Sequence, residues 1–283
     1  MRNFTFKGLF LAAMFMVLGS LAIQAADDDG LITKQIIVKL EKAGTLPDRI
    51  GSTKRDKITN LKIIGEINGT DLRVIRYMSD RDTGGKLAIL DLSEAKIVRG
   101  GDYYYYDYEE FYTHDNELGT HAFYGCRGLT SLTLPSGLTS IGSWAFTGCS
   151  GLTSLSLPSG VTSIGDGAFF GLSSLTSLSL PSGLTSIGDQ AFHECSGLTS
   201  LSLPSGITSI GNQVFCYCSG LTSLSLPSGL TSIGNGAFYG CSGLTSIYVY
   251  AEKMPKLGTN MFDDCDAKKC TVYVPKGTYD DYW

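Results

Sequence analysis

The chain has 283 residues, of which 43% are hydrophobic and 17% charged, and its net charge at pH 7 is −5. The length suits one large domain or two small ones. An acidic chain without a basic run offers no electrostatic attraction to nucleic acid or anionic lipid. We therefore expect no nucleic-acid partner.

Residues 1–25 have the pattern of a secretory signal peptide. Arg2 and Lys7 supply positive charge, residues 8–21 are apolar, and small residues follow at Ala25 and Ala26. The alternative is a membrane anchor, but the apolar run is shorter than the roughly 20 residues that a membrane-spanning helix needs. We expect an exported protein, secreted or at the cell surface, with the periplasm as a further destination and no membrane insertion after signal cleavage.

Residues 26–57 are predicted to form an N-terminal cap, in which "KQIIVKL" is a strand and "TLPDRI" a short helix. Such a cap is needed because the open end of a repeat stack exposes its core. Farther on, "NGTD" (68–71) reads either as a glycosylation site or as a turn in which Thr70 caps the helix "DLRVIRYM". The turn is the favoured interpretation.

Residues 58–117 are predicted to be degenerate repeats that carry a tyrosine-rich insertion. The pattern L-x-x-L-x-L is visible in "ITNLKI" and "LAILDL", and the insertion "GGDYYYYDYEEFYTHDNE" (100–117) follows. Tyrosine gives a large amphipathic contact area at low entropic cost, as in antibody loops. Two interpretations stay open: a binding loop, or a loop that folds back over the flank and buries half of its rings.

Residues 118–266 consist of 23-residue repeats, whose full copies begin at Leu129, Leu152, Leu175, Leu198 and Leu221. In "LTSLSL" the first, fourth and sixth residues should point inward, with Ser and Thr facing water. Pro ends this strand, and a second apolar pair such as Leu138 and Ile141 returns the chain to the core. A single unit cannot bury its own apolar face, so the units must stack.

After "IG" each unit places a residue that favours a helix N-terminus. These residues are Thr120, Ser143, Asp166, Asp189, Asn212 and Asn235. The pattern predicts one helical turn over "x-A-F-x-x-C". The expected fold class is therefore an α/β solenoid, a right-handed superhelix with a parallel β-sheet, 23-residue repeats and one-turn helices.

Two columns of the repeat are predicted to form the structural core. The sulfur column tolerates leucine in one unit, which favours a small buried hydrophobe over a metal ligand or an obligatory disulfide. Its members, with the aromatic column, are Phe123, Phe146, Phe169, Phe192, Phe215, Phe238, Phe262, Cys126, Cys149, Leu172, Cys195, Cys218, Cys241 and Cys265. Cys216 belongs to a variable column and is predicted to be exposed. A disulfide between Cys265 and Cys270 stays open.

No catalytic or metal-binding pattern stands out. The three histidines, His114, His121 and His193, lie outside metal-ligand spacings, and no serine occupies a G-x-S-x-G elbow. We expect no enzyme, no cofactor and no metal.

Variation between units gathers beside the predicted helical turn, where aromatic residues recur. Exposed aromatic side chains are typical of binding hot spots, although neutral drift on a tolerant scaffold explains the same variation. The candidate partner-binding residues are Tyr124, Trp144, Phe170, His193, Tyr217 and Tyr239, with Tyr103, Tyr104, Tyr105, Tyr106, Tyr108 and Tyr112 of the insertion.

The blocks "LTSLSLP", "LTSIG" and "AFxxCSG" resemble the BspA-type leucine-rich repeats of bacterial surface proteins, and residues 58–78 and 86–98 look like the leader of exported members from Bacteroides-like bacteria. The resemblance implies adhesion to a protein or glycan of the host or of other bacteria. A structural envelope scaffold and a carbohydrate-recognising module without catalysis are the alternatives. Residues 267–283 look like a partial C-terminal cap.

Overall fold

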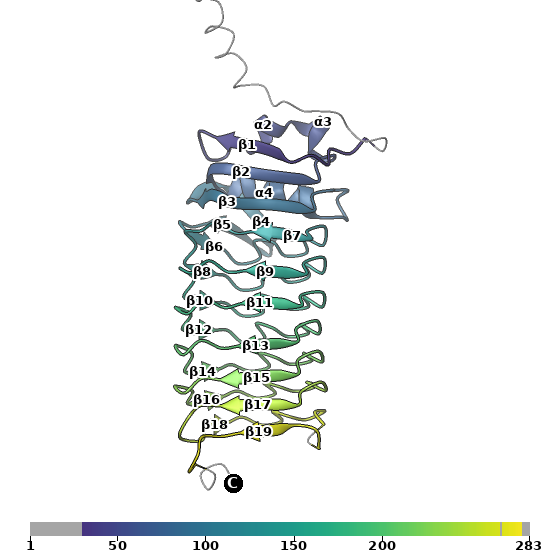
Figure 1. The fold of residues 1–283 in the computed structure, drawn as a ribbon. Coiled ribbons are helices and arrows are strands. Elements are labelled where there is room, and N and C mark those ends of the chain that lie inside the picture. Colours follow the sequence, from purple (N-terminus) through teal and green to yellow (C-terminus); the bar gives the residue numbers. More distant parts are fainter. Residues whose placement is uncertain (1–29, 267, 279–283) are drawn as a thin grey trace, which may run out of the picture.

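The computed structural model describes residues 30–266 and 268–278 as a stack of turns along one axis (Figure 1). Each turn adds a strand to a parallel face, and from β6 onward each turn also adds a second, short strand. The predicted solenoid is confirmed. The predicted signal peptide, residues 1–25, lies outside the described residues.

The strands of the main face run in parallel from the N-terminal to the C-terminal end of the stack. Repeat positions align across the turns, so that Leu155 is paired with Leu178 and Leu224 with Ile247. These strands are β1 (Ile36–Leu40), β2 (Asn60–Ile67), β3 (Ile89–Ile97), β7 (Ser131–Thr133), β9 (Ser154–Ser156), β11 (Ser177–Ser179), β13 (Ser200–Ser202), β15 (Ser223–Leu226), β17 (Ser246–Val249) and β19 (Thr271–Tyr273).

In the repeats from β8 to β16, the second line of strands follows the "PSG" turns, as the apolar pair predicts. Its register is again one repeat, with Ile141 paired to Ile164. These strands are β6 (Glu117–Leu118), β8 (Ser140–Ile141), β10 (Ser163–Ile164), β12 (Ser186–Ile187), β14 (Ser209–Ile210), β16 (Ser232–Ile233) and β18 (Lys256–Leu257).

The N-terminal part contains α2 (Leu46–Ile50), α3 (Ser52–Arg55) and α4 (Gly69–Ser79). The cap of α4 differs from the prediction, because Asn68 and not Thr70 is the capping residue. The Asn68 side chain accepts a hydrogen bond from the Thr70 backbone N–H (3.1 Å), and Asp71 accepts one from the Asn68 N–H (3.0 Å). This reciprocal capping box buries Asn68, which disfavours the glycosylation interpretation.

The segment "x-A-F-x-x-C" of each unit is a run of hydrogen-bonded turns rather than a helix. Its backbone N–H groups donate to two kinds of acceptor, carbonyl oxygens of the same turn and carbonyl oxygens of the next turn. The Cys126 N–H donates to Phe123 O in the same turn (3.1 Å), whereas the Phe123 N–H donates to Ala145 O of the next turn (2.7 Å). In an α-helix these N–H groups would bond to carbonyl oxygens of the same unit. In the turn conformation they are free to bond to the neighbouring unit, so the units are joined by hydrogen bonds on this side as well.

The predicted N-cap column has a different task. Asp166 Oδ1 accepts from the Asp189 backbone N–H of the next turn (2.9 Å), and Asp189 Oδ1 accepts from the Asn212 N–H (2.7 Å). Asn212 continues the series to the Asn235 N–H (3.0 Å). The N-cap prediction is therefore wrong for these residues, which form a polar ladder between units.

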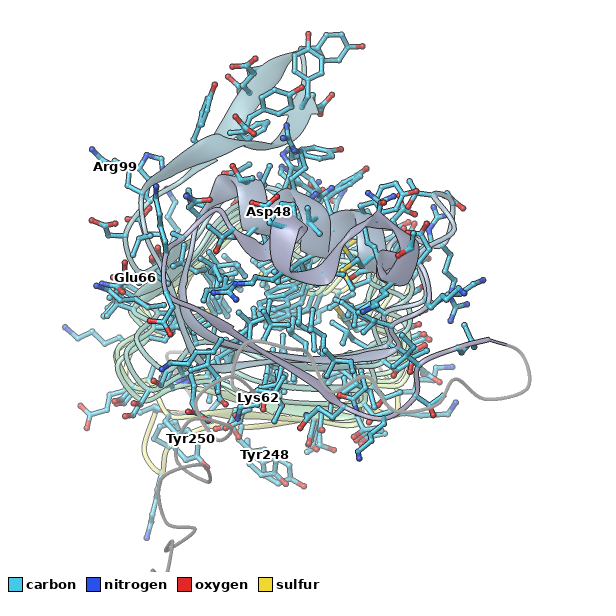
Figure 2. The ribbon with its side chains drawn as sticks, turned by 90° about the horizontal axis from the view of Figure 1, so that it is seen from above. Asp48, Lys62, Glu66, Arg99, Tyr248 and Tyr250 are labelled. Carbon is cyan, nitrogen blue, oxygen red and sulfur yellow. The ribbon has the colours of Figure 1, made fainter. Side chains whose placement is uncertain are left out.

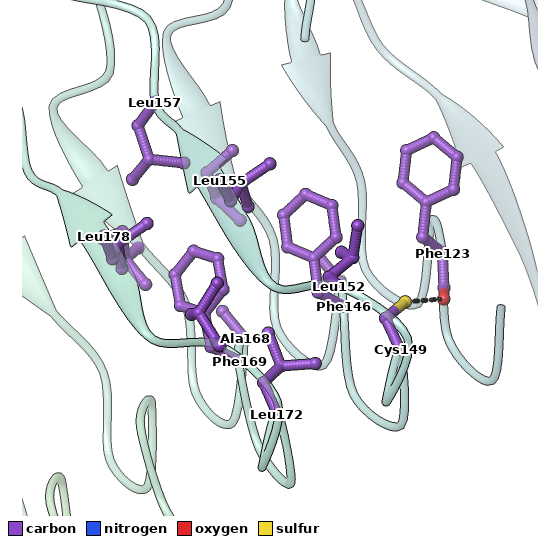
Figure 3. Close-up of a cluster of buried hydrophobic side chains, with 14 of the residues drawn as sticks. Phe123, Phe146, Cys149, Leu152, Leu155, Leu157, Ala168, Phe169, Leu172 and Leu178 are labelled. Carbon is purple, nitrogen blue, oxygen red and sulfur yellow. Dashed lines mark hydrogen bonds between the residues drawn. The ribbon is translucent and has the colours of Figure 1, made fainter. Parts of the chain in front are cut away.

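The predicted core columns run through the stack. The phenylalanine rings of consecutive turns lie 5.2–5.7 Å apart between centroids and within 12° of parallel. Figure 3 shows Cys149 directing its Sγ at Phe123 O, at 2.9 Å, and Leu172 in the same column without such a bond. The Cys column therefore contributes weak S–H donors besides apolar volume.

Three residues depart from the predicted burial. Phe262 stacks on Phe238 but is 39% exposed, because it lies in the last of the described stacked turns. Cys265 is only partly buried for the same reason. Cys216, predicted to be exposed, is 2% exposed.

Candidate functional site

A row of side chains follows the turn segments on one edge of the stack. We call it the aromatic edge: Tyr124, Trp144, Phe170, His193, Tyr217 and Tyr239. Ring contacts link five of them, from Trp144 to Phe170 (5.8 Å between centroids), Phe170 to His193 (4.6 Å, 4° between planes), His193 to Tyr217 (5.8 Å) and Tyr217 to Tyr239 (5.4 Å). The repeat therefore brings residues from different units, far apart in the sequence, into one continuous surface.

Two members of the edge have left-handed backbone conformations. Trp144 has φ +56°, at a position where another unit has Gly167, and Tyr217 has φ +57°, where others have Gly125, Gly148 and Gly240. Left-handed backbone costs an L-residue about 1–2 kcal/mol, and such strain is concentrated at functional sites. Glycine is the common residue at the Tyr217 position, whereas most units carry a side chain at the Trp144 position, as Gln190 and Gln213 do.

Glycine on the next turn makes room for each of these rings. A Cβ placed on Gly167 would lie 2.3 Å from Trp144 Cε3, and one on Gly240 would lie 2.5 Å from Tyr217 Cδ1. Distances below 3.0 Å cannot be tolerated without movement. Each ring thus lies directly over the backbone of the following unit.

A groove opens beside Tyr217, with a volume of about 430 Å³. Its lining includes His193, Gln213, Tyr217, Asn235, Tyr239 and Asn260. Burial lowers the pKa of His193 below 6.5, so this imidazole is neutral at pH 7. A hydrogen bond to the Asp264 carboxylate raises the pKa of Tyr239 to about 12, so this phenol stays protonated.

The tyrosine-rich insertion is a β-hairpin, β4 (Gly100–Asp107) and β5 (Glu109–Thr113), which pair antiparallel. Figure 2 shows it projecting from the side of the stack opposite Lys62, Tyr248 and Tyr250. The folded-back interpretation holds in part, because some rings pack onto the flank, whereas the rings that face water stay candidates for binding.

Tyr104 is the buried ring of the hairpin. Its side chain is 3% exposed, and its hydroxyl donates to Thr120 O at 2.6 Å. Burial raises the pKa of this phenol above its ordinary value. The prediction that Tyr104 contacts a partner is wrong, since it anchors the hairpin to the first repeat.

Tyr105 joins a cluster at the foot of the hairpin. Its ring lies 4.9 Å from His121 and 5.6 Å from Tyr124, and Phe111 lies 5.0 Å from His121. The Arg76 guanidinium, from α4, stacks over Tyr105 at 4.4 Å. Burial lowers the pKa of His121, the histidine of this cluster. The cluster connects hairpin, helix and the Tyr124 end of the aromatic edge.

The remaining tyrosines of the hairpin are available to a partner. Tyr106, Tyr108 and Tyr112 are exposed, and Tyr108 is 96% exposed at the tip. Tyr103 is half-buried beside Arg73, whose guanidinium lies 5.4 Å from its ring. Tyr112 donates a hydrogen bond to Glu110.

A further aromatic patch lies on the main face, where the sequence interpretation expected only Ser and Thr. Tyr248 and Tyr273 stack across β17 and β19, 4.8 Å apart and 7° from parallel, and Tyr250 is exposed nearby. The replacement of "LSLP" by "IYVY" in the last unit was the signal that could have revealed it.

Among the described residues, no group of three His, Cys, Asp or Glu side chains could hold a metal ion. Cys265 and Cys270 are both free thiols in the structure, so the disulfide left open is not formed there. No helix within the described ranges has the length and apolarity to cross a membrane.

The repeats match a known family. The sequence profile of the BspA type leucine rich repeat region matches in six copies, over residues 108–219 and 149–269. The chain belongs to the BspA-type leucine-rich repeat family. No curated protein matches it.

A solved structure agrees with the leucine-rich repeat fold. A leucine-rich repeat protein of T. pallidum is 34% identical, with a TM-score of 0.52, over 55% of this chain and 71% of that one. A leucine-rich repeat protein from Bacteroides ovatus is 22% identical (TM-score 0.48) over 90% of this chain and 75% of that one. A leucine rich cell surface protein from Faecalibacterium prausnitzii is 17% identical (TM-score 0.29) over 91% and 94%.

The BspA-type profile does not account for the whole candidate site. Its matches begin at residue 108, so β4 and α4 lie before them. The aromatic edge lies inside the matched region, but in the columns that vary between units. Family membership therefore explains the scaffold and leaves the surface to be explained.

Proposed function

We propose that this chain is an exported, non-enzymatic repeat protein that binds a protein or glycan at the host or bacterial surface. The aromatic edge is the observation that carries the proposal. Trp144 and Tyr217 lie in left-handed backbone that costs the free protein stability, and partly exposed aromatic side chains are enriched at binding hot spots. Membership of a family of bacterial surface proteins supports the location.

The hairpin is the second contact surface of the proposal. Tyr106, Tyr108 and Tyr112 are exposed on a two-stranded ribbon that Tyr104 and the Tyr105 cluster fix to the stack. A fixed ribbon loses less entropy on binding than a mobile loop would. The hairpin and the aromatic edge meet at Tyr124, which contacts Tyr105, so one partner could span both.

Direct binding tests the proposal. The purified protein would be titrated against immobilised host matrix proteins and against whole bacterial cells. An edge variant carries Trp144→Gly and Tyr217→Gly, and a hairpin variant carries Tyr106→Ser and Tyr108→Ser. A control variant carries Tyr248→Ser on the opposite face.

We expect saturable binding that one or both test variants weaken and the control does not. A loss of about tenfold or more is expected for rings at the centre of an interface. Binding that all variants retain would contradict the assigned surface. Association only with cell-envelope material, unaffected by the edge and hairpin variants, would favour the structural envelope scaffold instead.

A further inference from the structure

We propose that the groove beside Tyr217 is a binding site for a neutral saccharide. This inference rests on the proposed function and names the ligand chemistry for one part of the aromatic edge. The groove volume of about 430 Å³ lies within the range of small-molecule sites.

The aromatic rings that line the groove are steeply inclined to one another. Tyr217 meets His193 at 75° and Tyr239 at 82°, and its ring is 46% exposed. A pyranose ring has apolar C–H faces and a rim of hydroxyls, so it needs an aromatic face beside polar groups. A half-exposed ring in a groove provides the first of these.

Amide side chains provide the second. The carbonyl oxygen of Gln213 accepts from Gln190 Nε2 (2.7 Å), which leaves the Gln213 amide nitrogen as the group available to a ligand. The carbonyl oxygen of Asn235 accepts from the Thr259 backbone N–H (2.9 Å) and hydroxyl (3.1 Å), which leaves its amide nitrogen available. Neighbour contacts thus orient both amides, and sugar hydroxyls are acceptors for such donors.

The charge around the groove disfavours an anionic ligand, because the Asp264 carboxylate accepts a hydrogen bond from Tyr239 and the Glu194 carboxylate lies 3.7 Å from His193 Nδ1. Among the described residues that line it, none is Lys, Arg, Asp or Glu. The His193 imidazole is neutral at pH 7, because burial lowers its pKa. A sulfated or sialylated glycan would lose hydration here without meeting an opposite charge.

Backbone strain marks the same residues. Gln213 (φ +55°), Tyr217 (φ +57°) and Asn260 (φ +56°) are all left-handed, and the equivalent positions of other units include Gly167 and Gly240. The same conformation recurs outside the groove at Trp144, Gln190 and Glu194, so it belongs to these repeat positions, and the aromatic and amide lining is what distinguishes the groove.

The strain also gives a sharp test. Tyr217→Gly and Gln213→Gly each restore the residue that other units have, so they relieve strain while removing a proposed contact. The purified protein would be screened on an array of neutral, sialylated and sulfated oligosaccharides. The best neutral binder would then be titrated by calorimetry against each variant and against the control Tyr248→Ser.

We expect a neutral oligosaccharide to bind, and each groove variant to lose about tenfold or more of that affinity. Neither variant should unfold at a markedly lower temperature, because the relief of strain offsets the lost packing, and this separates lost contact from lost fold. Absence of neutral binders, or affinity that Tyr217→Gly and Gln213→Gly leave intact, would overturn the saccharide assignment.

A parallel arm separates this inference from the proposed function. Host matrix proteins would be presented before and after periodate oxidation, which destroys sugar diols. Binding that survives oxidation and depends on the aromatic edge would contradict the saccharide site. It would leave the proposed function, binding to a surface protein, intact. Absence of binding to every glycan, protein and cell would overturn both.

Discussion

At Gly167 the backbone has φ +57°, and the Trp144 indole occupies the place where a Cβ would lie. Gly171, four residues on, has φ +74° and open space around its missing Cβ. Both positions favour glycine because their backbone is left-handed. Only Gly167 is also required to be glycine by packing, since the Trp144 ring leaves no room for a Cβ. This difference allows the contribution of the edge ring to be measured.

We expect Gly171→Ala to lower the free energy of unfolding by about 1–2 kcal/mol, the cost of an L-residue in the left-handed region. Gly167→Ala should cost about 1–3 kcal/mol more, because the new methyl overlaps the indole. Urea unfolding of both variants checks this. In a Trp144→Gly background the excess should disappear, and equal losses in the wild-type background would contradict the proposed packing.

The buried thiols respond to pH in a predictable direction. Burial raises the pKa of Cys126 and of Cys195 to about 12. Below pH 9 these thiols are protonated in the folded and the unfolded chain, so their stabilising effect is fully present. As the pH rises from 9 toward 12 only the unfolded chain ionises, and stability is lost at about 1.4 kcal/mol per pH unit for each thiol.

We expect Ellman's reagent at pH 8 to modify Cys265 and Cys270, which are partly exposed, and to spare Cys126 and Cys195 until the protein is unfolded. Urea unfolding at pH 7 and pH 10.5 measures the alkaline loss. Cys195→Leu copies the natural Leu172 and should reduce that loss by the share of one thiol. Rapid labelling of Cys195 in the native protein would be evidence against its burial.

The sequence predicted the residue columns better than the direction of individual side chains. The presence of Leu172 in the Cys column identified that column as core, because leucine can neither bind a metal nor form a disulfide. Asp189 was misread as a helix cap, because its local spacing suits a cap and its true partner, the Asn212 amide, lies 23 residues away. Phe262 kept its column but not its burial, because burial depends on the neighbouring turn.

Among the elements, the hairpin and α4 are joined to the repeats through Arg76. Its guanidinium donates to the carbonyl oxygens of His121 (2.6 Å), Ala122 (3.0 Å) and Tyr124 (3.1 Å), while its face stacks on Tyr105. Arg73, one helical turn earlier, has only an exposed ion pair with Asp102 (2.7 Å) and a distant ring contact. The two arginines differ in role despite their proximity.

We expect Arg76→Lys to destabilise the protein by about 2 kcal/mol, because lysine cannot replace a planar guanidinium that satisfies three carbonyls and stacks on a ring. Arg73→Lys should cost less than about 1 kcal/mol, as is usual for an exposed ion pair. Hydrogen exchange of residues 100–113 should accelerate in Arg76→Lys only. Equal acceleration in both variants would show that Arg76 has no special role in holding the hairpin.

The alternation in "YYYYDYEEF" was not interpreted as two strands, because tyrosine fits either a wet or a buried face. The hairpin became recognisable only through Tyr104, whose partner Thr120 lies in the first repeat. The strands of the repeats, by contrast, were predictable, because apolar residues recur in each unit at the same spacing. Periodic sequence therefore determined the elements that stack, and not the element that interrupts the stack.

At the scale of the whole molecule, the hydrogen bonds that join the described repeats connect neighbouring turns, and many of them join equivalent residues. The threonine hydroxyl of Thr176 donates to Thr153 O (3.1 Å), and that of Thr222 donates to Thr199 O (3.0 Å), both across 23 residues. In such a stack the stability is close to a sum of unit and nearest-neighbour terms. A complete unit can therefore be removed without changing the kind of contact at the junction.

We expect deletion of residues 175–197 to give a folded, less stable solenoid. Phe169 would then stack on Phe215, and Asp166 would accept from the Asn212 amide, as their equivalents do now. Deletion of residues 175–194 is the control, because it breaks the repeat by three residues and should prevent folding. Circular dichroism and urea unfolding compare the two, and similar behaviour of both would refute the nearest-neighbour description.

The 23-residue step has a consequence for reach. Neighbouring strands of a sheet lie about 4.8 Å apart, so each added unit lengthens the molecule by only that distance. The same 23 residues as an extended chain would span roughly 76–83 Å. Growth by duplication would therefore make a poor stalk. Each copy would instead add one more row of side chains to the surface beside Trp144 and Tyr217. Duplication would therefore enlarge the contact surface and add almost nothing to the reach of the molecule.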